Sequence, residues 1–151
     1  MSDARTPEAG RWTGPLHLLP VRVYYEDTDF TGVVYYANYL KFFERGRTDA
    51  LRTAGVSHEE LLRADPPLGF AVRRITVEYA QPARIDDALT VETRFVEARG
   101  ARMAIAQRIL RGDDLIATAE VEAVCIDLEG RAKRPPRWMM AAWADWVRPE
   151  D

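Results

Sequence analysis

The spacing of hydrophobic and polar residues changes period along this chain. Between Ala37 and Thr53 apolar residues recur at helical spacing with charged residues between them, which predicts a long amphipathic helix. Gly46 lies inside it and is a poor helix former, so we expect close packing there. Ser57 and Glu60 have the form of a capping box, which predicts a short second helix. The chain therefore places two helices after its first extended segment.

Strand-like alternation precedes and follows these helices. Residues 16 to about 26 are rich in strand formers, and four more alternating segments follow from about residue 70. Turn-like sequences separate them, at 81–83, 97–100 and 111–114. Short turns between long strands predict antiparallel pairing. One antiparallel sheet of about five strands wrapped around one long central helix would bury both apolar surfaces, which is an α+β fold.

Three regions are expected from the composition along the chain. Residues 1–14 are polar and interrupted by proline and glycine, as in a flexible tail. Residues 15–135 form the sheet-and-helix domain. Residues 136–151 hold an aromatic-rich helix and tail, expected to dock on the core or on another subunit. Nearby acidic residues argue against a basic membrane-binding face.

Composition limits the function further. The 151 residues carry a formal net charge of -3, so there is no electrostatic case for nucleic acid. The single cysteine, Cys125, excludes an intrachain disulfide and fits a reducing compartment. The N-terminus lacks the apolar run of a signal peptide, and no stretch approaches the roughly 20 apolar residues of a membrane span. We therefore expect a cytoplasmic protein without stable membrane insertion.

The segment between the first strand and the long helix carries the candidate chemistry. Glu26, Asp27 and Asp29 are followed by Gly32 and then by the helix. Unpaired amides at a helix start carry partial positive charge, so they can hold an oxyanion while a carboxylate attacks or activates water. The alternative is that the acids only cap a helix. Asp27 and Asp29 lie close enough to interact, so one carboxyl would have a raised pKa if buried.

Other catalytic devices are missing from the sequence. There is no nucleophile-elbow serine, no phosphate-binding glycine loop and no set of metal ligands at working spacing. His17 and His58 are expected to be ordinary strand or helix-surface residues, and Cys125 a small core residue. No metal or cofactor is expected. Any enzyme here must use carboxylates and backbone dipoles, which suits a substrate with a good leaving group such as a thioester.

Residues 24–45 resemble the signature of the hotdog-fold acyl-CoA thioesterases, in particular the Tol-Pal-associated YbgC branch and its relative 4-hydroxybenzoyl-CoA thioesterase. The similarity continues through 70–73 and 79–87 and covers roughly residues 16–135. It implies a hotdog fold, in agreement with the element order above. It also implies hydrolysis of an acyl-CoA thioester without metal or bound cofactor, and a homodimer or homotetramer with active sites at subunit interfaces.

The resemblance assigns roles to individual residues. The family's catalytic aspartate is the second of its D-x-D and falls on Asp29, as nucleophile or general base, while its oxyanion-binding backbone amide falls near Tyr36. Gly32 and Val33 are then expected to contact substrate, and Asp27 to be a structural or pKa-tuning neighbour. The YbgC branch usually has histidine where this chain has Tyr36, whereas the 4-hydroxybenzoyl-CoA relatives have tyrosine. A backbone amide works with either side chain, so the difference bears on substrate choice.

Arginines are the candidate contacts for the acyl carrier. Arg73, Arg74 and Arg84 could meet CoA phosphates, since arginine pairs well with phosphate, or they could be solvated strand and turn charges. The carrier is CoA or, as an alternative, acyl carrier protein. The acyl group itself is not specified by these residues.

Two other functions compete with thioester hydrolysis. Residues 27–31 also fit the D-x-D-x-T of haloacid-dehalogenase phosphatases, with Asp27 as nucleophile and magnesium bound. That motif belongs at the end of a strand in a parallel βαβ sheet, and the consecutive hairpin-linked strands expected here argue against it. A non-catalytic protein that binds acyl-CoA or acyl carrier protein on the same fold is the third function, because fold does not fix function.

Overall fold

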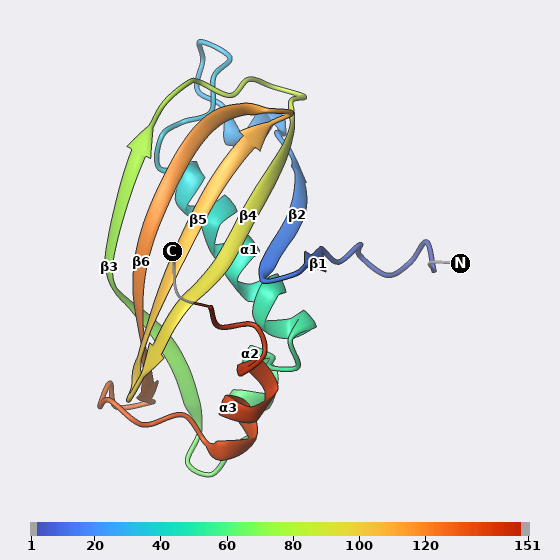
Figure 1. Cartoon of the computed structure of the whole chain (residues 1–151). Helices are drawn as coiled ribbons and strands as arrows, with labels where there is room; N and C mark the ends of the chain where they lie inside the picture. Colours follow the sequence, from blue (N-terminus) through green and yellow to red (C-terminus); the bar gives the residue numbers. More distant parts are fainter. Residues whose placement is uncertain (1–2, 149–151) are drawn as a thin grey trace.

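A long helix crosses the concave face of a curved antiparallel sheet (Figure 1). The computed structural model describes residues 3–148. The six strands follow the order β1-β2-β4-β5-β6-β3 across the sheet, and every pairing is antiparallel. Their bounds are β1 (Arg11–Thr13), β2 (Leu16–Arg22), β3 (Leu68–Tyr79), β4 (Ala88–Arg99), β5 (Arg102–Arg111) and β6 (Asp114–Asp127).

The central helix α1 (Asn38–Thr53) lies mainly over β2 and β4 and fills the sheet's concave face with Phe42 and Phe43, which are fully buried. Gly46 determines how closely α1 approaches the sheet. A β-carbon at Gly46 would lie 2.6 Å from Cγ1 of Val91 on β4, closer than real contacts allow. The expected close packing at this glycine is therefore confirmed.

Gln107 interrupts the apolar alternation of β5 because it faces α1 rather than solvent. Its side-chain amide donates to the carbonyl oxygen of Phe43 and to Oγ1 of Thr93, both at 2.9 Å. Its carbonyl oxygen accepts from Arg47 at 3.0 Å. Every polar atom of this buried side chain is thus satisfied, which removes the usual cost of burying an amide.

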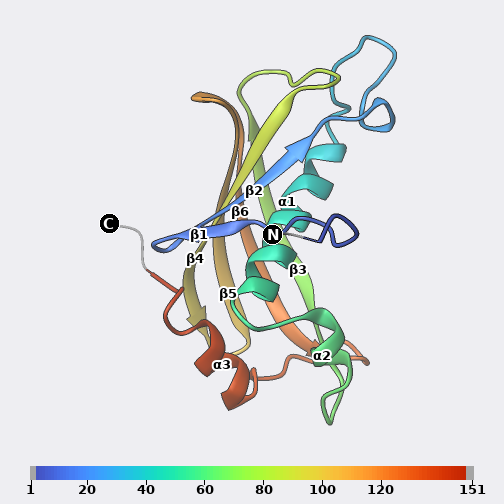
Figure 2. The same cartoon turned by 90° about the vertical axis from the view of Figure 1, so that its right-hand side faces the viewer.

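The two ends of the molecule differ in construction (Figure 2). The short helices α2 (His58–Leu62) and α3 (Arg137–Trp143) sit together at one end, and the loop that leads into α1 lies at the other. Ser57 accepts a hydrogen bond from the amide of Glu60 at 3.1 Å, so the cap expected for α2 is confirmed. Trp143 of α3 is buried and lies against Phe70 of β3, so α3 docks on the core.

The sheet has six strands rather than about five, because Arg11–Thr13 folds back as β1 onto β2. This strand lies inside residues 1–14, which the sequence suggested to be a flexible tail. The first long strand also ends earlier than expected, at Arg22 instead of about residue 26, since a single 3-10 turn, η1 (Tyr25–Asp27), follows it. The division into three regions stays a prediction.

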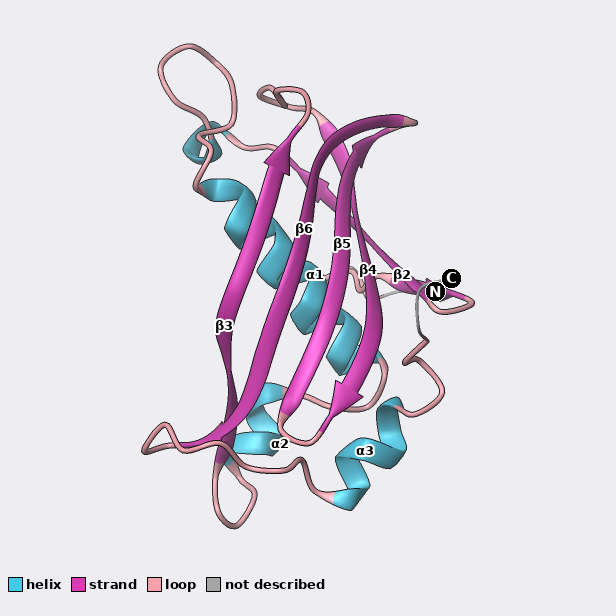
Figure 3. Ribbon diagram, turned by 60° about the vertical axis from the view of Figure 1, so that its left-hand side comes forward, coloured by secondary structure: helices cyan, strands magenta, loops and turns pink. Residues whose placement is uncertain are grey.

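Strand β3 forms one edge of the sheet, as Figure 3 shows. It is 12 residues long and pairs with β6 alone, with a bulge between Val72 and Arg74. Its last residue, Tyr79, reaches the end of the molecule where the chain enters α1. Within residues 3–148, no helix combines the length and apolar character needed to cross a membrane.

Candidate active site

The acidic segment forms a small hairpin ahead of α1. The amide of Tyr35 donates to the carbonyl oxygen of Asp27 at 3.0 Å, and the amide of Asp29 donates to that of Val33 at 2.9 Å. The amide of Gly32 donates to the carbonyl oxygen of Asp29 at 3.1 Å and closes the turn. Gly32 has a φ of +86°, which favours glycine because a β-carbon would be strained there. Sequence neighbours are thereby folded into one compact unit.

Asp27 holds this hairpin together. Its carboxylate accepts from the amide of Tyr24 at 2.8 Å and caps η1. Its carbonyl oxygen also accepts from the side-chain amide of Asn38, the first residue of α1, at 2.8 Å. The side chain is buried. Its position supports the structural role expected for Asp27, and the capping expected of these acids is found on η1.

Asp29 is oriented by a neighbour two residues along. Its Oδ1 accepts from the backbone amide of Thr31 at 2.8 Å and from the Thr31 hydroxyl at 2.6 Å. These hydrogen bonds hold the pKa of Asp29 below the usual value for an aspartate, with the Thr31 side chain as the largest cause. Thus Asp29 is ionised at neutral pH, and the raised pKa that burial would have given it is not found. The backbone amide of Val33 also lowers the pKa of this carboxylate, to a smaller extent than Thr31.

The start of α1 offers unpaired donors. The amide of Asn38 donates to the carbonyl oxygen of Tyr35 at 2.8 Å, and that of Leu40 donates to the carbonyl oxygen of Ala37 at 3.2 Å. Across residues 3–148, the amides of Tyr36 and Ala37 meet no acceptor, and no side chain caps the helix. Such amides carry the partial positive charge of a helix N-terminus. The hairpin and the helix start therefore supply a carboxylate and two free donors within one short segment.

Aromatic rings gather around these donors. The rings of Tyr35 and Tyr36 lie 4.9 Å apart, and those of Tyr36 and Tyr79 lie 6.3 Å apart in an edge-to-face arrangement. Interaction with Tyr36 raises the pKa of Tyr35. Phe30, at the hairpin tip, is fully exposed. An apolar substrate group or another protein surface would bury these rings.

Residues 83–85 brace the hairpin from the side. The amide of Val34 donates to the carbonyl oxygen of Ala83 at 2.8 Å, and Val33 forms an isolated bridge with Arg84. The structure thus brings four of the residues expected at the site, Gly32, Val33, Tyr36 and Arg84, around Asp29 and its turn.

Arg73 lies apart from this group. It precedes Tyr79 by six residues on β3, which is about 20 Å at 3.3 Å per residue. Its guanidinium lies 3.5 Å from the Glu122 carboxylate on β6. Arg73 therefore does not meet the other expected site residues within one chain.

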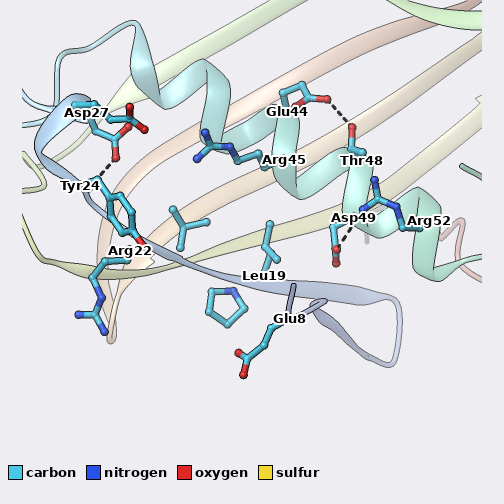
Figure 4. A pocket seen from close by; sticks show the side chains of 13 residues that line it. Glu8, Leu19, Arg22, Tyr24, Asp27, Glu44, Arg45, Thr48, Asp49 and Arg52 are labelled. Carbon is cyan, nitrogen blue, oxygen red and sulfur yellow. Dashed lines mark hydrogen bonds and ion pairs between the residues drawn. The ribbon is translucent and has the colours of Figure 1, made fainter. Parts of the chain in front are cut away.

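A cavity lies beside the hairpin rather than at Asp29. It has a volume of about 490 Å³ and lies between β2 and α1, where Leu19, Arg45 and Asp27 point toward it (Figure 4). Neither Asp29 nor Tyr36 lines it. Asp27 lines this cavity, whereas the candidate chemistry at Asp29 and the start of α1 lies outside it.

Sequence reasoning missed a buried pair outside the hairpin. His17 is 0% exposed, and its Nε2 lies 2.8 Å from Oδ2 of Asp49 on α1. The amide of Gly10 donates to the same oxygen at 2.8 Å, so one carboxylate ties the N-terminal segment to β2 and α1. Burial lowers the pKa of His17, which Asp49 partly opposes. His17 is a strand residue, as expected, but its burial and its partner were not anticipated, because no local pattern reveals a partner on a distant helix.

The other single residues behave more simply. Cys125 is buried in β6 as expected, and burial raises the pKa of its thiol. His58 lies 3.0 Å from the Thr48 hydroxyl, between α2 and α1. Among residues 3–148, no group of three or more His, Cys, Asp or Glu side chains is arranged to hold a metal ion.

Comparison with known proteins places this chain in a family. Residues 23–144 match the model of the thioesterase-like superfamily. The acyl-CoA thioesterase YbgC of Haemophilus influenzae is 46% identical over 72% of this chain and 79% of its own length. The acyl-CoA thioester hydrolase YbgC of Escherichia coli is 44% identical over 81% of this chain and 91% of its own.

A solved structure agrees with these relatives. A probable thioesterase from Bartonella henselae is 43% identical, covers 80% of this chain and 99% of its own, and superposes with a TM-score of 0.78. The curved antiparallel sheet around α1 is the architecture expected of a hotdog thioesterase. The chain therefore belongs to the thioesterase-like superfamily, and the expectations of a thioesterase and of its hotdog fold are confirmed.

Proposed function

We propose that this protein hydrolyses acyl-CoA thioesters with Asp29 as the reacting carboxylate and the amides of Tyr36 and Ala37 as the oxyanion hole. The observation that carries the proposal is the presence, within one short segment, of an ionised carboxylate in the hairpin and of two amides at the helix start that meet no acceptor among residues 3–148. Its YbgC relatives are named for the same reaction. A thioester is the fitting substrate because its thiolate leaves without a strong acid, and none is present in the hairpin.

The hydrogen bonds of Asp29 define which atom reacts. Thr31 occupies Oδ1 with two donors, which leaves Oδ2 to attack the thioester carbonyl or to take a proton from water. A carboxylate with a lowered pKa is a weak base at neutral pH, because general bases work best with a pKa near the working pH. The lowered pKa weakens the same carboxylate as a nucleophile, so it does not choose between two routes at this atom. Oδ2 attacks the carbonyl to form a mixed anhydride, the CoA thiolate leaves, and water then hydrolyses the anhydride to regenerate Asp29; or Oδ2 takes a proton from the water that attacks the thioester.

The carrier end of the substrate would meet arginine. Arg84 is exposed and faces Val33 across the bridge that braces the hairpin, so it is the proposed contact for a CoA phosphate. The contact proposed for Arg73 requires a second copy, because within one chain it lies far along β3. Acyl carrier protein is a second possible carrier, since its phosphopantetheine arm presents the same thioester. Both carriers are cytoplasmic, which is the location we propose.

We further propose that the protein is a homodimer or homotetramer paired through β3. This edge strand offers a long row of backbone groups to another chain. Its end carries Tyr79 beside the hairpin, so pairing there would enclose the open site. Analytical ultracentrifugation should detect dimers or tetramers at micromolar concentration. A monomer at the concentrations used for kinetics would contradict this assembly.

The first experiment is hydrolysis of a panel of short, long and aromatic acyl-CoAs, with EDTA present. Wild type should turn over at least one of them, and Asp29→Asn should not. Glu26→Gln is the matched control, because it removes an exposed acid three residues away and should keep full activity. A parallel assay with a phosphate ester tests the competing function. Phosphatase activity that EDTA abolishes would support the magnesium-dependent phosphatase suggested by residues 27–31. Acyl-CoA binding without turnover would instead indicate a binding protein.

A further inference from the structure

Tyr79 connects the edge strand to the turn that begins α1. Its backbone is fixed at the end of the β3–β6 ladder, where it pairs with Ala117. The phenol hydroxyl donates to the carbonyl oxygen of Tyr36 at 3.1 Å, across 43 residues of sequence. The contact therefore links the sheet to a turn that its own hairpin and residues 83–85 also hold.

This carbonyl belongs to a particular peptide group. The carbonyl of Tyr36 and the amide of Ala37 share one planar unit, so a bond to the oxygen fixes the direction of the N–H. The adjoining carbonyl, that of Tyr35, already accepts from the amide of Asn38 at 2.8 Å. With both carbonyls held, the orientation of the Ala37 amide is set by Tyr79 on one side and by the first turn of α1 on the other.

The Tyr79 ring and hydroxyl are held in place by their surroundings. The ring packs edge-on against Tyr36 at 6.3 Å and against Tyr39 at 5.4 Å. Tyr39 is anchored in turn, because its hydroxyl accepts from the amide of Ala83 at 3.0 Å. Burial, together with the neighbouring Tyr36, raises the pKa of Tyr79. The phenol therefore stays protonated and remains a donor at neutral pH.

We propose that Tyr79 is a positioning residue that orients and polarises the Tyr36–Ala37 peptide of the oxyanion hole. A donor on a carbonyl oxygen strengthens the N–H of the same peptide, since hydrogen bonds in a chain polarise one another. The inference rests on the proposed thioesterase function, and it adds a residue that the acidic motif does not contain. Tyr79 does not touch the reacting atoms; it acts through the peptide that does.

Tyr79→Phe tests the proposal because it removes only the hydroxyl. We expect kcat to fall about tenfold, less than the roughly 100-fold that loss of an oxyanion donor itself costs. KM should stay within about twofold, because the hydroxyl acts in the transition state. Tyr24→Phe is the matched control: it removes an exposed tyrosine hydroxyl at the same end of the molecule and should leave kcat unchanged.

A second readout does not depend on turnover. In ¹⁵N–¹H spectra the amide of Ala37 should shift in Tyr79→Phe and not in Tyr24→Phe, because its peptide alone loses a carbonyl partner. An unchanged kcat with an unchanged Ala37 resonance would overturn the inference while leaving the thioesterase intact. A matching loss of melting temperature, kcat and affinity would show that Tyr79 only stabilises the fold. Failure of wild type on every thioester would remove the proposed function, and the Ala37 resonance would still test the contact.

Discussion

Two aspartates, Asp29 ahead of α1 and Asp49 within it, show how this fold uses the same side chain in opposite ways. Asp29 lies partly exposed in the hairpin, and its Oδ1 is held by the amide and hydroxyl of Thr31. Asp49 is 7% exposed, and its Oδ2 accepts from Gly10 while it pairs with the buried His17. The Asp29 carboxylate is oriented but accessible to a substrate, whereas the Asp49 carboxylate is buried and already bonded to protein groups.

The difference teaches where stability and chemistry are separated in this molecule. Asp49 joins the N-terminal segment and β2 to α1 through Gly10 and His17, so its loss would loosen the fold. The partners of Asp29 come from its own turn, so its loss would leave the fold intact. Reactivity can reside in a locally built hairpin because the buried pair and the core hold the scaffold independently.

The largest expected effect is on catalysis by Asp29→Asn. We expect kcat to fall about 1,000-fold, which is about 4 kcal/mol of transition-state stabilisation at 1.36 kcal/mol per factor of ten. The melting temperature should change by no more than about 2 °C, because the side chain contacts only its own turn. Steady-state kinetics and thermal denaturation of the same samples measure both. A large drop in melting temperature would show that Asp29, like Asp49, is needed for stability.

Asp49→Ala should show the reverse behaviour. It leaves the His17 ring and the Gly10 amide without their acceptor, which should cost about 3 kcal/mol of unfolding free energy. The kcat of the folded protein should stay within about threefold of wild type. Urea denaturation measures the loss, and Asp49→Asn, which keeps an acceptor oxygen, should lose less. Equal stability of Asp49→Ala and wild type would mean that the buried pair contributes nothing.

A smaller effect concerns the pH dependence of the rate. The hydrogen bonds from Thr31 lower the pKa of Asp29, so the reactive carboxylate stays ionised as the pH falls until that lowered pKa is reached. Activity should therefore be flat from neutral pH down to the ordinary aspartate pKa of about 3.9 and fall only below it. Thr31→Val removes the largest cause of the shift and should move the acid limb upward. If the acid limb of the pH–rate profile does not move in Thr31→Val, a group other than Asp29 is responsible for it.

The smallest effect is expected at Trp12→Phe, next to the buried pair. The Trp12 indole donates to the Thr53 hydroxyl at 2.9 Å and stacks on Trp146 at 4.4 Å. Loss of that hydrogen bond should cost about 1 kcal/mol of stability. The kcat should be unchanged, since this contact lies beside the buried His17–Asp49 pair and away from Asp29. Chemical denaturation measures the loss of stability. Reduced activity per folded molecule would contradict the idea that stability and catalysis depend on separate regions.

Much of this architecture could be predicted from local pattern. The long helix was expected over 37–53 and is found at Asn38–Thr53, because helical periodicity and the glycine after it are local signals. The two aspartates, the turn glycine and the helix start were also visible because they are adjacent in sequence, whereas the hairpin that they form was not predicted. Antiparallel pairing followed from the short turns between strands.

What escaped prediction depends on contacts between distant residues. In the sequence, Gln107 interrupts the apolar alternation of β5. Its burial is explained only by the carbonyl of Phe43 on α1, which accepts its hydrogen bond. Pairing of His17 with Asp49, and of Tyr79 with the Tyr36 carbonyl, joins segments that share no sequence pattern. Periodicity reports which face of an element is buried, but it does not report which residue lies opposite.

The bulge in β3 also bears on the solubility of the protein. A long edge strand with open backbone groups can template indefinite strand addition. Here the bulge between Val72 and Arg74 breaks the regular register, and Arg73 and Arg74 place two exposed cations at the break. Charged residues on an edge strand oppose unregulated strand addition. Replacing both arginines with threonine should therefore make this chain prone to aggregate as its concentration rises, whether or not it retains its activity.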